Sequence, residues 1–108
     1  MMKLVLAIVN ADDAHAVINN LTQEGYSVTR LATTGGFLKT GNTTVIIGVD
    51  EEKVPHVLEI INKHSHSRKQ LVSTASELGM GFFPSVPTEI TVGGATIFVL
   101  DVEQFAKF

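Results

Sequence analysis

The chain has 108 residues, a formal net charge of -3 and no cysteine. Apolar residues make up 44% and charged residues 18%, which predicts one globular domain spanning residues 1–108. The negative charge argues against a nucleic-acid polymer as partner, and the lack of cysteine excludes disulfides and thiolate metal sites. No stretch approaches the roughly 20 apolar residues that span a bilayer, so we expect a soluble cytoplasmic protein without a membrane partner.

The first elements follow from residue spacing. Residues 3–9 form a continuous apolar run, as in a strand that is buried on both faces. Asn10, Asp12 and Asp13 then predict the start of a helix, and Gly25 predicts its end. The apolar stripe of this helix consists of Ala14, Val17, Ile18 and Leu21.

A similar strand and helix follow. Residues 26–34 and 43–49 predict the second and third strands, and the acidic residues 50–52 open a second helix. Because Pro55 lies early in this helix, its regular part is expected to begin slightly later. Its apolar stripe consists of Val54, Val57, Leu58 and Ile61.

Repetition of this strand and helix pattern predicts an α+β fold of the ferredoxin-like kind, βαββαβ, with residues 68–73 as the fourth strand. An additional C-terminal strand pair, residues 88–92 and 95–102, is expected around Gly93 and Gly94. The glycine-rich and proline-containing stretch 74–87 predicts a long loop, and residues 103–108 predict a short turn or helix.

The predicted strands are apolar on more faces than two helices can cover. Residues 4–9, 45–49 and 97–100 are apolar on both faces, and the chain has no third long helix. Association of several copies through the sheet is the simplest way to bury the remaining face.

The loop between the second and third strands carries the candidate binding residues. The pair Gly35 and Gly36 lies between strands, which excludes a Walker or Rossmann loop but allows either an anion-binding nest or a plain turn. Phe37 could fold into the core or stack on a nucleobase, and Asn42 could serve a turn or hydrogen-bond adenine. Together these residues predict a nucleotide pocket.

Neither a metal site nor a catalytic group is predicted. His64 and His66 lack a third ligand and suit a solvated helix end. An enzyme would need a catalytic residue that faces a cleft, for which His15 and His56 are the candidates, but no catalytic constellation surrounds them.

Three segments carry a resemblance to a known family: MKLVLAIV, LATTGGFLKTGNTTVIIGV and VGGATIFVLDVEQFAKF. They resemble the PII-like cyclic di-AMP receptor proteins of firmicute bacteria over residues 2–108. The resemblance implies a homotrimer of ferredoxin-like subunits with one nucleotide in each cleft between subunits. It also implies signal transduction without catalysis, and therefore a downstream protein partner.

The resemblance implies a role for each matching position. Phe37 would stack on an adenine and Asn42 would hydrogen-bond its edge. Thr29 would contribute a hydroxyl, and Gly48 would let the ligand approach the third strand. Backbone contacts around a phosphate or base would come from Gly36, Phe37 and Leu38.

The chain departs from the family pattern near this site. Ser27 stands where members of the family commonly carry arginine, and Gly25 stands where asparagine is usual. The stretch 74–87, with Phe82 and Phe83, is unlike its family counterpart. An alternative is therefore a trimeric PII-like interaction protein that has lost cyclic di-AMP or binds another adenine nucleotide.

Overall fold

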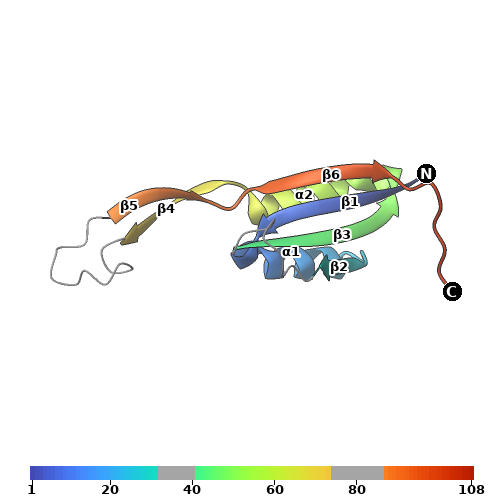
Figure 1. Cartoon of the computed structure of the whole chain (residues 1–108), viewed down its shortest axis with the longest axis horizontal. Coiled ribbons are helices and arrows are strands. Elements are labelled where there is room, and N and C mark those ends of the chain that lie inside the picture. The colour runs from blue at the N-terminus through green and yellow to red at the C-terminus, as the bar shows by residue number, and fades with distance from the viewer. Residues whose placement is uncertain (32–40, 74–86) are drawn as a thin grey trace.

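A computed structural model describes residues 1–31, 41–73 and 87–108 of the chain. Its body contains helices α1 and α2 and a four-stranded sheet, and a separate two-stranded ribbon extends from it (Figure 1). The elements of the body are β1 (Met2–Asn10), α1 (Ala11–Gln23), β2 (Val28–Leu31), β3 (Asn42–Asp50), a 3-10 turn (Glu51–Lys53), α2 (Val54–Ser65) and β6 (Ala95–Asp101). The ribbon consists of β4 (Arg68–Ser73) and β5 (Pro87–Val92).

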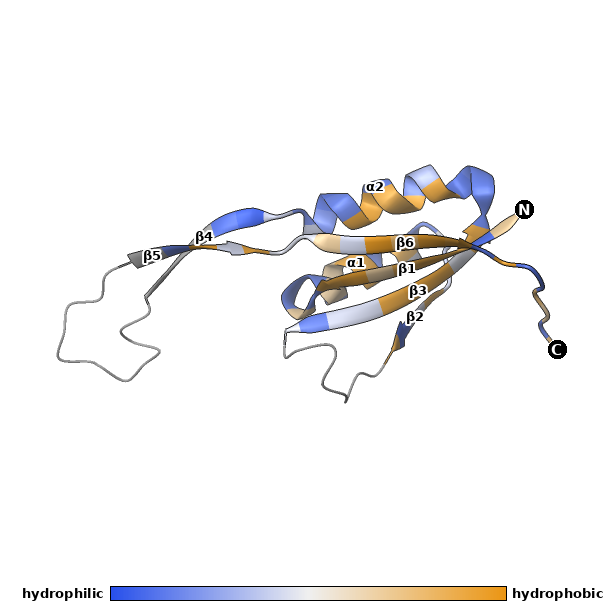
Figure 2. Cartoon of the chain, turned by 45° about the horizontal axis from the view of Figure 1, so that its top comes forward, coloured by the Kyte–Doolittle hydropathy of each residue, from blue (hydrophilic) through white to orange (hydrophobic). Residues whose placement is uncertain are grey.

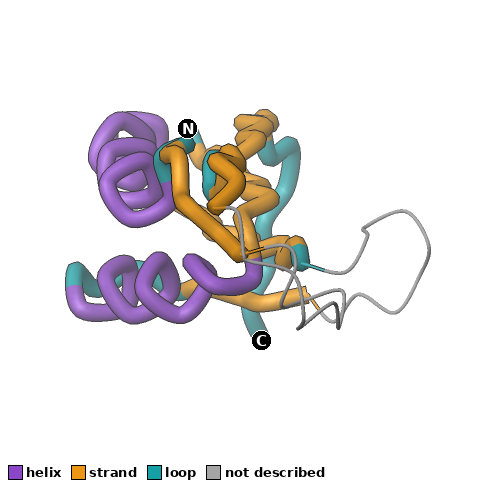
Figure 3. The backbone as a smooth tube through the Cα atoms, turned by 90° about the vertical axis from the view of Figure 1, so that its left-hand side faces the viewer, coloured by secondary structure: helices purple, strands orange, loops and turns teal. Residues whose placement is uncertain are grey.

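The sheet of the body is antiparallel throughout, with strand order β2-β3-β1-β6. Both helices lie against the same face of this sheet (Figure 3). The buried core between helices and sheet consists of Val5, Ala7, Val9, Ala14, Val17, Leu21, Val45, Ile47, Val49, Val57, Ile60 and Ile61. The fold is thus a mixed one of two layers, helices on one side and sheet on the other.

The helices begin where the capping residues predict. The side chain of Asn10 accepts a hydrogen bond from the backbone N–H of Asp12 at 2.9 Å, which satisfies a free donor of the first turn of α1. Pro55 lies in the first turn of α2, directly after the 3-10 turn that the acidic residues open. The predicted stripes of both helices are confirmed, since their members are buried or pack against the core.

The other face of the sheet, which we call the open face, is covered by no helix of the described residues. Residues directly opposite in antiparallel strands point to the same face, so the register identifies its members. Its apolar side chains are Met2, Leu4, Leu6, Ile8, Leu31, Ile46, Phe98 and Leu100. Phe98 is 53% exposed and Leu100 is 46% exposed. The strands of the body are mainly hydrophobic, in contrast to the more polar ribbon (Figure 2).

The prediction was wrong about the fourth strand. Residues 68–73 are a strand, but β6 takes the place beside β1, and β4 pairs with β5 instead. The expected pairing of residues 88–92 with 95–102 is also absent from the described sheets. The position beside β1 contacts the core on one face, which suits the apolar sequence ATIFVLD of β6 better than the sequence RKQLVS of β4.

The ribbon makes the chain long. The principal extents of the chain are 60 × 27 × 20 Å. The radius of gyration of the chain is 17.4 Å, against about 13 Å for a compact chain of this length. The predicted continuation of β2 through residues 32–34 lies outside the described residues. Most of the predicted loop 74–87 also lies outside them.

An ion pair joins the base of the ribbon to α1. Arg68 donates hydrogen bonds to both carboxylate oxygens of Asp13, at 2.8 and 3.2 Å, and the Asp13 carboxylate is buried. The hydrogen bond to Asp13 raises the pKa of the Arg68 guanidinium above its usual value. A side chain at Gly93 would meet this guanidinium, because an added Cβ would lie 2.5 Å from Arg68 Nη1. Glycine at position 93 therefore leaves the space that this guanidinium and the carbonyl oxygen of His66 occupy.

Candidate functional site

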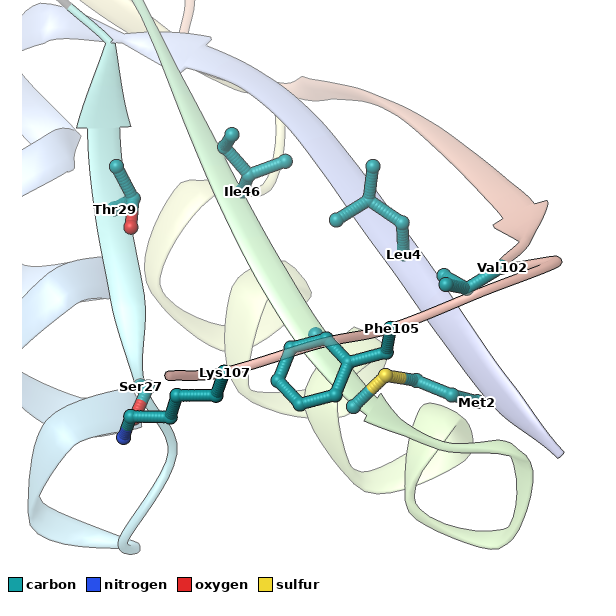
Figure 4. A pocket seen from close by; sticks show the side chains of 9 residues that line it. Met2, Leu4, Ser27, Thr29, Ile46, Val102, Phe105 and Lys107 are labelled. Atoms are coloured by element: carbon teal, nitrogen blue, oxygen red, sulfur yellow. The ribbon is translucent and has the colours of Figure 1, made fainter.

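A cavity of about 420 Å³ lies on the open face (Figure 4). This volume is within the range of roughly 300–1,000 Å³ that is usual for small-molecule sites. Its lining consists of Met2, Leu4, Ser27, Thr29, Ile46, Gly48, Val102, Phe105 and Lys107.

Three adjacent strands place the residues that form the floor of this cavity. Thr29 of β2 lies opposite Ile46 of β3, and Gly48 of β3 lies opposite Leu4 of β1. These residues therefore share the open face. An added Cβ at Gly48 would meet only Met2 Cε, at 3.9 Å. The missing side chain at this position contributes to the open space of the cavity.

Residues 103–108, which we call the tail segment, form part of the cavity wall. The prediction of a turn or helix for them is wrong, since they are irregular with a single bend. The backbone N–H of Val102 donates to the carbonyl of Met2 at 3.1 Å, which fixes the chain where the tail segment begins. Beyond this point Phe105 and Lys107 reach back over the open face (Figure 4).

The chemistry of the lining suits an organic anion. Most of its members are apolar, and Ser27 and Thr29 offer hydroxyl groups that can donate or accept hydrogen bonds. Among the lining residues that the structure describes, Lys107 is the one cation, and there is no carboxylate. A surface of this kind can pack against a planar ring and hold one or more negative groups nearby.

Of the six residues predicted to bind a ligand, Thr29 and Gly48 meet in this cavity. Asn42 lies on the open face as well, but six residues from Gly48 along β3, which is about 20 Å at roughly 3.4 Å per residue. Asn42 is not among the lining residues. The remaining three, Gly36, Phe37 and Leu38, lie outside the described residues.

Comparison with known proteins assigns the family. Residues 2–108 match the family described as cyclic-di-AMP receptor. The chain belongs to this family.

Three solved structures resemble the chain in fold. A protein of Pediococcus pentosaceus, described as functionally unknown, is 44% identical with a TM-score of 0.79, and the match covers 99% of this chain and 97% of that one. The PII protein of Arabidopsis thaliana, solved with citrate, is 21% identical with a TM-score of 0.55, and the match covers 94% and 74%. A DUF3240 family protein of Shewanella baltica is 10% identical, also with a TM-score of 0.55, and the match covers 99% and 96%. At these low identities the last two matches show that the fold is PII-like.

Arg30, a cation of β2, points away from the cavity. It lies opposite Val45, on the face that the helices cover. Its guanidinium donates to the hydroxyl of Thr43 at 3.5 Å. A negatively charged ligand on the open face therefore receives no charge from Arg30.

The histidines of the chain do not line the cavity. The hydroxyl of Tyr26 and His56 Nδ1 are 2.6 Å apart in a hydrogen bond, and the side chains of Asn19 and His15 form another at 3.1 Å. Within the described ranges, no group of three or more potential metal ligands occurs. No described helix is long and apolar enough to cross a membrane.

Sequence analysis missed most of the cavity wall. Leu4 and Ile46 were assigned to buried strands, without regard to the face that they occupy, and Met2 was assigned to no element. Phe105 and Lys107 were assigned to a short terminal element with no function. Strand parity could have identified the first group, because alternate residues of β1 and β3 must point away from the helices. The path of the tail segment has no comparable local signal.

Proposed function

We propose that the chain is a non-catalytic signal-transduction protein that binds cyclic di-AMP in clefts between the subunits of a homotrimer. The observation that carries this proposal is the cavity on the open face, in a chain that matches the cyclic-di-AMP receptor family over residues 2–108. Thr29 and Gly48, which the family resemblance assigns to the ligand, both line this cavity.

Assembly is supported by the open face itself. Phe98 and Leu100 are about half exposed, next to the partly buried Leu4, Leu6 and Ile46. An apolar face of this extent on a soluble domain is typical of an interface. A cleft that a second copy completes also explains how one site could include both Thr29 and the distant Asn42.

The assembly is tested by light scattering after size exclusion. The wild type is expected to have the mass of a trimer. Phe98→Glu, which places a charge on the open face, should shift the mass toward that of a monomer, because burial of an unpaired charge is costly. Asn19→Glu is the matched control, since Asn19 is exposed on α1, away from the open face. A wild-type mass of one chain at all concentrations would contradict the trimer.

Ligand identity is tested by calorimetric titration of the wild type with cyclic di-AMP, cyclic di-GMP and ATP. We expect cyclic di-AMP to bind most tightly. Absence of cyclic di-AMP binding to a folded trimer would contradict the proposed ligand. Tighter binding of ATP would instead favour the second candidate, a PII-like protein for another adenine nucleotide. The neutral Ser27 in the cavity is the observation that keeps this candidate open.

Selectivity for adenine is assigned to Asn42. The side-chain amide of Asn42 can donate a hydrogen bond to N7 of adenine and accept one from the N6 amino group. Guanine presents two acceptors at this edge, N7 and O6, so the amide oxygen of Asn42 would have no donor to pair with. The contact contributes roughly 1–3 kcal/mol of discrimination. Asn42→Ala should remove most of the preference for cyclic di-AMP over cyclic di-GMP, and Phe37→Ala should weaken both by loss of stacking. Equal binding of the two dinucleotides to the wild type would refute this role of Asn42.

A further inference from the structure

The cavity needs a positive charge if it holds a cyclic dinucleotide, and this inference rests on the function proposed above. Such a ligand carries two negative charges, while the chain has a formal net charge of -3. Long-range attraction is therefore unfavourable, and local groups must compensate for the phosphates. The question is which cation of the described residues is able to do so.

The cations of the neighbouring strands are engaged on the opposite face. Arg30 lies on the helix-covered side and donates to Thr43. Lys3 lies opposite Val49, also on that side, and forms an ion pair with Asp101. The hydrogen bond to Asp101 raises the pKa of Lys3, so the ammonium group of Lys3 stays charged and paired with Asp101.

Lys107 remains as the cation of the lining that the structure describes. Its side chain comes from the tail segment and extends toward Ser27, at the β2 side of the cavity (Figure 4). The ring of Phe105 lies between Lys107 and Met2 (Figure 4), so the tail segment supplies one apolar and one charged group to the same wall.

The tail segment lines the cavity and does not fill it. With Phe105 and Lys107 in place, about 420 Å³ of space remains. A wall that leaves this volume open is compatible with an occupant of the site. An ammonium group at the rim can interact with a phosphate while its alkyl stem packs along the apolar lining.

We propose that the tail segment is part of the ligand site, with Lys107 binding a phosphate of cyclic di-AMP beside Ser27 and Phe105 closing the apolar wall. Ser27, which directly precedes β2, and Lys107 of the tail segment thus meet at one phosphate. The tail segment is ordered more firmly when ligand is bound, because both of its contributed groups then gain a partner.

The test is calorimetric titration of the full chain with cyclic di-AMP at two salt concentrations. Lys107→Ala should weaken binding about tenfold, because a charge-assisted hydrogen bond is lost. Its affinity should also fall less steeply with added salt than that of the wild type, since a partly exposed charge pair is screened. Lys107→Arg should retain both the affinity and the salt dependence.

Two further variants separate charge from packing. Phe105→Ala should weaken binding while leaving the salt dependence as in the wild type. Lys63→Ala is the control for loss of an exposed lysine, because Lys63 lies in the last turn of α2 and does not line the cavity. It should leave the affinity unchanged.

A double-mutant cycle tests whether Ser27 and Lys107 serve the same phosphate. Ser27→Arg places a second cation at this end of the cavity. Its gain in affinity should be larger in the Lys107→Ala background than in the wild type, because the two cations replace each other. Equal gains would mean that Lys107 acts elsewhere.

The outcomes distinguish this inference from the function on which it rests. If the wild type binds cyclic di-AMP and Lys107→Ala binds it equally well, the role of the tail segment is refuted. Tighter binding by Lys107→Ala or Phe105→Ala would also refute it, because the tail segment would then obstruct the site. If the wild type binds ATP but not cyclic di-AMP, and Lys107→Ala weakens ATP, the proposed ligand fails while the tail segment keeps its role. If the wild type binds no nucleotide, both proposals fail.

Discussion

A methyl group added at Gly48 should change the stability and the ligand affinity of this chain in opposite directions. Gly48 lies within β3 on the open face, and its added Cβ would meet only Met2 Cε, at 3.9 Å, an ordinary van der Waals distance. Gly48→Ala therefore fits the free subunit without strain. Alanine within a strand is more stable than glycine by roughly 0.5–1 kcal/mol, because the unfolded chain has less conformational freedom.

The same methyl group would project into the cavity. Overpacking of a filled site costs roughly 1–3 kcal/mol, which corresponds to about 5- to 150-fold weaker binding of cyclic di-AMP. Urea denaturation at fixed protomer concentration measures the first effect, and calorimetric titration measures the second. Unchanged affinity in a Gly48→Ala protein with normal or increased stability would show that the ligand does not approach this part of β3.

Two further predictions concern the stability of the fold. Gly25 and Gly93 both have positive φ, +91° and +79°. An added Cβ has open space at Gly25, whereas at Gly93 it would lie 2.8 Å from the backbone carbonyl oxygen of His66, which cannot move aside as the end of a side chain can. Alanine should thus cost about 1 kcal/mol at Gly25, from backbone strain, and about 2–4 kcal/mol at Gly93, where crowding is added. Equal losses in urea denaturation would contradict the crowding at Gly93. Asn10→Ala should lower the unfolding free energy by about 1 kcal/mol through loss of the N-cap of α1, whereas Asn19→Ala should change it by less than about 0.5 kcal/mol. A loss for Asn10→Ala as small as that for Asn19→Ala would mean that the cap does not contribute.

The two helices and most strands follow from local sequence because their signals are local. The stripe of α1 and the side chain of Asn10 determine both the buried side and the start of that helix. The excess of apolar strand residues over what two helices can cover also predicted the open face correctly. Each of these inferences depends on neighbours within a few positions along the chain.

The pairing of β6 with β1, by contrast, was decided by tertiary structure. Residues 68–73 and 95–101 are both credible strands, and the choice between them depends on which one completes the core beside β1. Local propensity does not contain this information, because strand pairing joins residues that are distant in sequence. The glycines at 93 and 94, with positive φ, permit the chain to leave the ribbon and enter the sheet.

The residues of the candidate site likewise fall into two groups, those that the sequence indicated and those that only the tertiary structure located. The sequence by itself pointed to Thr29 and Gly48, through the family resemblance, and strand parity places both on one face of adjacent strands. Only the tertiary structure placed Phe105 and Lys107 over that face, although they lie between 57 and 78 residues further along the chain. The periodicity of a strand fixes the direction of its side chains, whereas an irregular segment takes its path from the surfaces that it meets after the rest of the chain has folded.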